Sequence, residues 1–536
     1  MAVVLALFLF SLATSVRAAA PPGTQERLRL LVRLLRLSFT VEIGCGPSAG
    51  FYFVWSATPT LSDLGLTRPD SPAGIERAAR AREVGIRHLQ VRAHERARTA
   101  LKDALNQLRA LGAPQSADAA ILADYARTLM LLGQFQEARR EAYRATEMAP
   151  GDSRAHATLA RCLAASAVAE LAPASSSSDS LADLRPSGLV SSDWKIAPGG
   201  AERARQLSLE ALRAADQAVA LAPQDAGVRL DRAVARAMDQ LGRFLIEAPS
   251  AAELTPVRLQ QAVFPAEALE DLRRAADLEP ANPRLLGTAA MVSVMTAALE
   301  RGVANIESLL FSRAWPLLDE SHRRQLRADL ARLEDLSATG DLSARATALE
   351  LVGVIQMLAL RDFAAAEANL RRVLVSDPER ESAWEALVLL LVTSNRFETL
   401  AAACESRLER RESARDRLLL AKAYSAVGDN AKVLAALEPA RRRHPEDFNI
   451  NLASAAALLR GAGDDTTLAQ AAQLISRAEK AAGNQATAEQ TANLLFLRGM
   501  FLALIDRSEL ARSHLERVLE LDPGHEAARE ALKLIE

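Results

Sequence analysis

The sequence predicts an all-α fold, a solenoid built from stacked helix pairs. Three observations lead to this prediction. Prolines close four units of equal length, which are 119–152, 347–380, 414–447 and 492–525. Small and large apolar residues recur in register within these units. The composition is 49% hydrophobic and rich in Ala, Leu, Arg and Glu, which favours helix.

The repeated positions are those where the two helices of a pair would cross. In the first halves a small or β-branched residue stands three positions before a large one: Ala126 and Leu129, Val354 and Met357, Ala421 and Tyr424, Gly499 and Leu502. In the second halves two positions recur: Ala138, Ala366, Val433 and Ala511, then Ala145, Val373, Ala440 and Val518. A period of about 34 residues with small residues at helix crossings and a terminal proline resembles the tetratricopeptide repeat family. The resemblance implies a right-handed superhelical solenoid that acts as an interaction surface.

The clearest unit predicts a first helix over 119–132, a turn at 133–135 and a second helix over 136–149, with Pro150 as the stop. The next pair has its first helix from Ser153 and its second helix over 201–221. Between these helices, 172–200 holds a serine run and Pro-Gly punctuation, which predicts a disordered insertion. The array therefore continues across a long loop.

Later units are less regular. A further pair is expected over 226–280 with an insertion near 246–265, and 283–343 is helical without a clear period. A weaker unit fills 381–413, a divergent one spans 448–483, and a short capping helix over 525–536 closes the array. The sequence thus predicts roughly nine units between 119 and 536.

The N-terminal region has three expected parts. Residues 1–20 are apolar and end in small residues, as in a secretory signal peptide, although no Lys or Arg precedes the apolar run. Residues 21–70 form an irregular lead-in. Residues 71–118 form a basic helical segment, whose positive charge fits either a solvated helix face or contact with an acidic partner or anionic lipid.

A second interpretation of the N-terminus concerns Cys45. Arg-rich apolar residues followed by Gly-Cys45 resemble a bacterial lipoprotein signal, in which Cys45 would be lipidated. Glu42 departs from that pattern, because an apolar residue is expected there. A surface amphipathic helix or a start codon placed too early are the alternatives.

Charge and composition limit the classes of partner. Sixty-five basic and 67 acidic residues give a net charge of −2, which argues against nucleic acid as the main partner. Aromatic residues make up only 4% of the chain. After the first 20 residues no segment is long and apolar enough to predict a membrane span, so any membrane contact would be peripheral. The scattered Cys162 and Cys404 lie in apolar helical patterns typical of buried thiols.

We predict no catalytic site, and we expect no enzyme activity, no cofactor, no metal and no small-molecule substrate. His94-Glu95 and His525-Glu526 both lack the second histidine four residues on that a helical zinc site requires. The phosphate-binding pattern G-x-x-x-x-G-K-[S/T] is missing from the sequence as well.

Two surfaces are candidates for binding a protein partner. The apolar stripe Leu351, Ile355 and Leu358 predicts a groove for an amphipathic helix or extended peptide, and burial beneath the next repeat is its alternative. Arg441-Arg442-Arg443-His444 is explained by the favourable interaction of cations with a helix C-terminus, with an acidic peptide as a second interpretation. The Lys and Asn pair with which some family members clamp a terminal carboxylate is not matched, for example at Ala123 and Arg127.

Together these observations predict a non-catalytic scaffold exported to the bacterial periplasm or envelope, acting in assembly or export of an envelope component. The alternative is a cytoplasmic or organellar assembly factor whose N-terminus is a transit peptide or a start codon placed too early.

Overall fold

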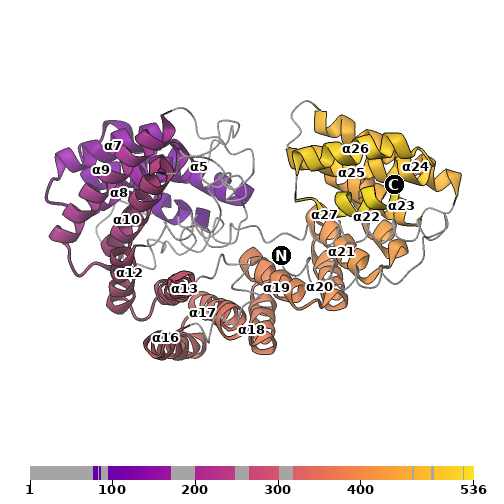
Figure 1. Cartoon of the computed structure of the whole chain (residues 1–536). Helices are drawn as coiled ribbons and strands as arrows, with labels where there is room; N and C mark the ends of the chain where they lie inside the picture. The colour runs from indigo at the N-terminus through magenta and orange to yellow at the C-terminus, as the bar shows by residue number, and fades with distance from the viewer. Residues whose placement is uncertain are drawn as a thin grey trace. The chain divides into compact units, whose positions relative to one another are not determined.

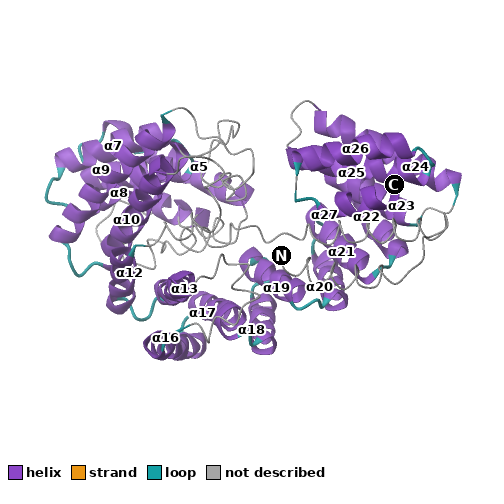
Figure 2. Cartoon of the chain, viewed as in Figure 1, coloured by secondary structure: helices purple, strands orange, loops and turns teal. Residues whose placement is uncertain are grey.

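A computed structural model describes residues 77–82, 84–85, 94–170, 199–247, 265–300, 318–461, 464–483, 488–522 and 524–535. Within these ranges the chain consists of helices and short connections, with no strand (Figure 2). The all-α prediction is confirmed. The predictions for 1–20, 21–70 and Cys45, and nearly all of the insertion at 172–200, lie outside the described residues.

The described residues divide into two compact units, and the larger comprises those up to Leu390. Its helices form antiparallel pairs in chain order after α5 (Figure 1). The bounds are α5 His94–Ala110, α6 Ala119–Leu131 with α7 Phe135–Met148, α8 Ser153–Glu170 with α9 Gly200–Leu221, α10 Ala226–Glu247 with α12 Ala266–Leu278, α13 Pro283–Glu300 with α16 Glu320–Thr339, and α17 Leu342–Ile355 with α18 Phe363–Ser376. A 3₁₀ turn, η1, spans Ala113–Gln115, and a π-helical turn, η4, spans Gln356–Leu360 at the end of α17.

The second unit contains the described residues from Leu391 to the end of α27. Helix α19 (Glu381–Thr393) spans the boundary between the units. The helices that follow are α20 Phe397–Arg410, α21 Ala414–Val427 with α22 Asn430–Arg443, α23 Phe448–Arg460 with α24 Asp465–Ala482, α25 Ala488–Leu504 with α26 Ser508–Leu521, and α27 Glu526–Ile535. The expected pairs and the final capping helix are therefore present.

Helix α8 pairs with α9 although the insertion separates them in sequence. The two helices therefore form one pair, as predicted. The Arg203 Nε atom donates a hydrogen bond to Glu170 Oε2 at 2.8 Å, which joins the two helix ends on either side of the insertion. In the 119–152 unit, three of the four helix ends differ from the predicted ends by one residue, and the start of the first helix agrees.

The repeated small residues form the contact between paired helices. All eight second-helix positions in register are buried. In the last repeat, a Cβ atom added to Gly499 would lie 2.9 Å from Leu515 Cγ, so α25 and α26 approach too closely there for any side chain. Because the helices touch at these positions, the small residues determine the spacing of each pair.

A second register is visible at the turn inside each pair. The residue seventeen positions before each terminal proline has a left-handed backbone: Gly133 (φ 82°), Arg361 (φ 56°), Gly428 (φ 90°) and Asp506 (φ 64°). This conformation ends the first helix and reverses the chain. Glycine adopts it without steric cost, whereas Arg361 and Asp506 do not. The left-handed backbone therefore recurs at this position in all four repeats, although the amino acid there varies.

Candidate partner-binding surface

The first helices of consecutive pairs contact one another in both units. In the larger unit α6 contacts α8, α8 contacts α10, and α13 contacts α17; in the other unit α21 contacts α23, and α23 contacts α25. Each unit therefore has a first-helix surface, which is the face that solenoids use for binding.

The predicted groove residues lie in the protein interior. Leu351, Ile355 and Leu358 are 8%, 0% and 5% exposed. Leu351 packs against α13. Leu358 lies in the π-helical turn η4. Because a π-helical turn holds more residues than an α-helical turn, Leu358 is rotated about the helix axis relative to Leu351 and Ile355. The alternative, burial beneath the next repeat, predicts that all three side chains are buried. A binding role for these residues stays a prediction.

Polar residues bridge the first helices in the larger unit, and we call Arg82, Asp124, Arg127, Thr158, Arg161 and Asp231 the polar row. Arg82 Nη2 pairs with Asp124 Oδ1 of α6 at 3.0 Å. Arg127 Nε of α6 donates to Thr158 Oγ1 of α8 at 2.9 Å, and Arg161 of α8 forms an ion pair with Asp231 of α10. The row therefore connects α6, α8 and α10 in sequence.

Burial perturbs the charges in the polar row. Desolvation, and next the nearby Arg161, lowers the pKa of Arg127 to about 10, so Arg127 still carries its charge at neutral pH. Desolvation raises the pKa of Asp231, and the pairing with Arg161 opposes that rise. With three arginines and two aspartates, the row carries excess positive charge.

Sequence reasoning missed the polar row, although a signal for it exists. Arg127 and Arg161 occupy the same position in consecutive repeats, as do Asp124 and Thr158. Reading the polar residues in the register already established for the apolar ones would have found them. That register does not reveal their burial.

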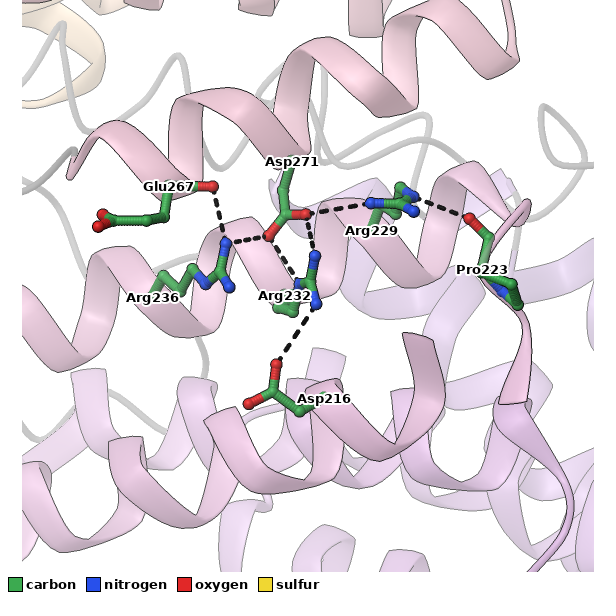
Figure 3. A network of polar contacts seen from close by, with 7 residues as sticks. All are labelled: Asp216, Pro223, Arg229, Arg232, Arg236, Glu267 and Asp271. Carbon is green, nitrogen blue, oxygen red and sulfur yellow. Dashed lines mark hydrogen bonds and ion pairs between the residues drawn. The ribbon is translucent and has the colours of Figure 1, made fainter. Parts of the chain in front are cut away.

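A second polar cluster joins α10 to its neighbours and is centred on Asp271 of α12, which is 2% exposed (Figure 3). Arg232 donates from Nε to Asp271 Oδ2 at 2.7 Å, and Arg236 Nη1 lies 2.7 Å from the same oxygen. Arg229 Nη1 reaches Asp271 Oδ1 at 3.5 Å. The three arginines follow one face of α10 at helical spacing.

The outer contacts of this Asp271 cluster extend to two other segments. Arg232 Nη1 lies 3.5 Å from Asp216 Oδ1 of α9, and Arg229 Nε donates to the carbonyl of Pro223 at 2.8 Å. Arg236 also donates to the carbonyl of Glu267 at 2.9 Å (Figure 3). Helices α9, α10 and α12 are thus joined by one buried carboxylate and its arginines, which indicates a structural role.

The two described cysteines are buried free thiols, as predicted. Burial raises the pKa of Cys162 to about 12 and also raises that of Cys404. Since the thiolate is the reactive form, neither group is activated as a nucleophile. Among the described residues, no group of three or more His, Cys, Asp or Glu is placed to hold a metal ion. None of the described helices is long and apolar enough to cross a membrane.

The sequence matches no family model and no curated protein. Several solved structures resemble it in fold. Yeast Tom70 shares 13% identity over 86% of this chain and 95% of its own, with a TM-score of 0.35. A tetratricopeptide repeat protein from Parabacteroides merdae shares 18% identity over 50% of this chain and 91% of its own, with a TM-score of 0.31. The Cut9–Hcn1 hetero-tetramer of APC/C gives 14% identity, coverage of 90% and 99%, and a TM-score of 0.22.

Likeness at these identities and TM-scores supports no conclusion about this chain's partners or function. The assignment depends on this chain itself: the 34-residue period, the antiparallel helix pairs, the buried small residues at their crossings and the left-handed turn in register. The chain is a tetratricopeptide-like helical repeat protein.

Proposed function

We propose that this protein is a non-catalytic scaffold that binds other proteins on its first-helix surfaces. The observation that carries the proposal is the direct contact between first helices of consecutive pairs, such as α6 with α8 and α21 with α23. A partner lying along such a surface contacts several repeats at once. An amphipathic helix or an extended segment fits this arrangement.

The setting we propose is the bacterial envelope, where the scaffold would act in assembly or export of an envelope component. The apolar residues 1–20, ending in small residues, support export. Lipidation at Cys45 would anchor the protein to a membrane of the envelope. The alternative, a cytoplasmic or organellar adaptor, is supported by the lack of a basic residue before the apolar run.

Site-specific cross-linking tests the scaffold function. A photoreactive amino acid replaces Leu418 on the first helix α21, or the exposed Gln473 on the second helix α24 as the matched control. We expect mass spectrometry to identify protein adducts at Leu418 and few at Gln473. Equal labelling at both positions, or none at either, would contradict binding on the first-helix surface.

N-terminal sequencing of the fractionated protein tests its setting. A new N-terminus near residues 19–21 in the envelope fraction is the expected result. Intact Met1 in the cytosol or an organelle would support the alternative adaptor.

A further inference from the structure

Four arginines and two glutamates gather where the chain passes from α20 into α21 and where α22 ends. We call Arg417, Arg441, Arg442 and Arg443, with Glu412 and Glu438, the basic edge. Arg417 Nη2 donates to Glu412 Oε2 at 2.7 Å, and Arg443 Nη1 lies 3.6 Å from the same carboxylate. Arg441 Nε donates to Glu438 Oε2 at 3.0 Å, and Arg442 Nε to Oε1 at 2.8 Å.

The two glutamates belong to one surface. The Arg443–Glu412 contact connects the end of α22 with the α20–α21 connection, and Arg417 Nη1 donates to the carbonyl of Ala436 in α22 at 3.2 Å. The arginines hold the pKa of Glu412 and of Glu438 below the ordinary value, mainly through hydrogen bonds from Arg417 and Arg441 respectively. Both carboxylates are therefore ionised at neutral pH.

Each carboxylate is shared by two guanidinium groups, so the basic edge carries an excess of two positive charges. Arg442 and Arg443 are 78% and 60% exposed, so much of each guanidinium group faces solvent. The partial negative charge of the α22 C-terminus offsets some of this excess. The remainder is available to a ligand with negative charge.

The size and chemistry of the basic edge favour carboxylates over longer polyanions. Membranes and nucleic acids are generally held by larger basic clusters and by many phosphate contacts. The guanidinium fork matches a carboxylate in a bidentate manner. Arg417 already holds Glu412 in this way, with Nε and Nη2 donating to the two carboxylate oxygens.

We propose that the basic edge is a docking site for an acidic segment of a protein partner, with Asp or Glu carboxylates paired to Arg442 and Arg443. This inference rests on the scaffold function and assigns a second surface to it, at helix ends instead of along the first helices. The site is independent of Leu351, Ile355 and the polar row.

The test measures binding of a fluorescein-labelled deca-glutamate peptide to the full chain by anisotropy. The variants are Arg442→Glu with Arg443→Glu, Arg442→Lys with Arg443→Lys, and the control Arg371→Glu with Arg372→Glu on α18, which makes the same change in net charge. Melting curves confirm that each variant folds. We expect the Glu variant to weaken binding at least about tenfold, the Lys variant to weaken it less, and the control to change it about twofold or less.

Parallel titrations use phosphatidylglycerol vesicles and a single-stranded oligonucleotide. The proposal is overturned if the Glu variant and the control weaken peptide binding equally, or if vesicles or oligonucleotide bind more tightly than the peptide through the same arginines. Failure of this proposal would leave adducts at Leu418 unchanged, whereas failure of the scaffold function would remove those adducts. The two failures are therefore distinguishable.

Discussion

Leu351 of α17 lies directly against the backbone of α13 at Gly287. A Cβ atom on Gly287 would be 2.6 Å from Leu351 Cδ1 and 2.9 Å from Cδ2. The two first helices can approach to this distance because one of them lacks a side chain at the crossing. An apolar residue that the sequence offered as a groove position is thus part of an inter-repeat contact.

The Gly287–Leu351 pair predicts a non-additive effect on stability. Gly287→Ala should destabilise the protein by about 1–3 kcal/mol through overpacking. Leu351→Ala should cost about 2–5 kcal/mol through a cavity. The double variant should be less destabilised than the sum, since the smaller side chain makes room for the new methyl group. Chemical denaturation checks this, and strictly additive values would show that the two residues do not share the contact.

The same burial predicts the outcome for the groove hypothesis. Converting Leu351 and Ile355 together to Ser should lower the melting temperature strongly, because Ile355 is fully buried. Partner capture should fall along with folding. If capture were lost while the melting curve stayed unchanged, the groove interpretation would be right and the packing one wrong.

The left-handed residue Arg361 predicts a stabilising substitution. Arg361→Gly should raise stability by roughly 1 kcal/mol, because glycine adopts φ 56° without the steric cost of a side chain. Loss of the contact between Arg361 and the Phe363 ring, 5.3 Å from the guanidinium carbon to the ring centroid, would reduce that gain. Arg396→Gly serves as the control, since φ there is −93° and glycine gives no relief. Similar melting shifts in both variants would contradict the strain argument.

The Asp271 cluster predicts a large effect from a small change. Asp271→Asn should destabilise the larger unit by about 3–5 kcal/mol, because three arginines would lose their shared counter-charge. The control is Glu267→Gln on the same helix, where only the backbone carbonyl takes part in the cluster. Urea denaturation measures both variants. A loss below about 1 kcal/mol for Asp271→Asn would show that solvent screens the arginines adequately.

His525 predicts a pH dependence at the C-terminal cap. Its Nδ1 atom accepts a hydrogen bond from the Ala528 N–H at 3.1 Å, and its ring lies 4.9 Å from that of Phe496. Burial lowers the pKa of His525, against the opposing charge of Asp522. The folded protein therefore favours the neutral ring. The contribution of His525 to stability is complete above the unfolded pKa of about 6.5 and is lost as the pH falls below it.

Hydrogen exchange of the α27 amides at pH 7.5 and 5.5, corrected for intrinsic rates, measures this effect. Protection in α27 should decrease at pH 5.5 in the native chain. His525→Asn keeps a side-chain cap but has no titrating ring, so its protection should not change with pH. An equal decrease in the variant would assign the pH dependence to other groups.

The insertion at 172–200 gives the last prediction. Replacing residues 174–196 with a short flexible linker should change the melting temperature little, since the length of a flexible loop has a small effect on closure entropy. Differential scanning calorimetry measures it. A large decrease would mean that the insertion packs against the helices.

The amino-acid sequence by itself determined the helix pairs and their order. Proline spacing and the register of small residues located α8 and α9 as one pair despite the insertion, because both signals are local and repeat with the helix geometry. The same signals located the turn before Phe135, but they did not predict Arg361 in a left-handed conformation, where the usual glycine is missing.

Only the tertiary structure decided which side chains meet between repeats. Arg161 pairs with Asp231 across an insertion, and three arginines share Asp271, because the rotation of each helix about its axis is set by packing against its neighbours. An apolar stripe such as Leu351 and Ile355 is the same in sequence whether the next repeat or a partner covers it. The repeat period is a property of one chain segment, whereas burial depends on what stacks upon it, and that is why the fold could be read from the sequence and the binding surface could not.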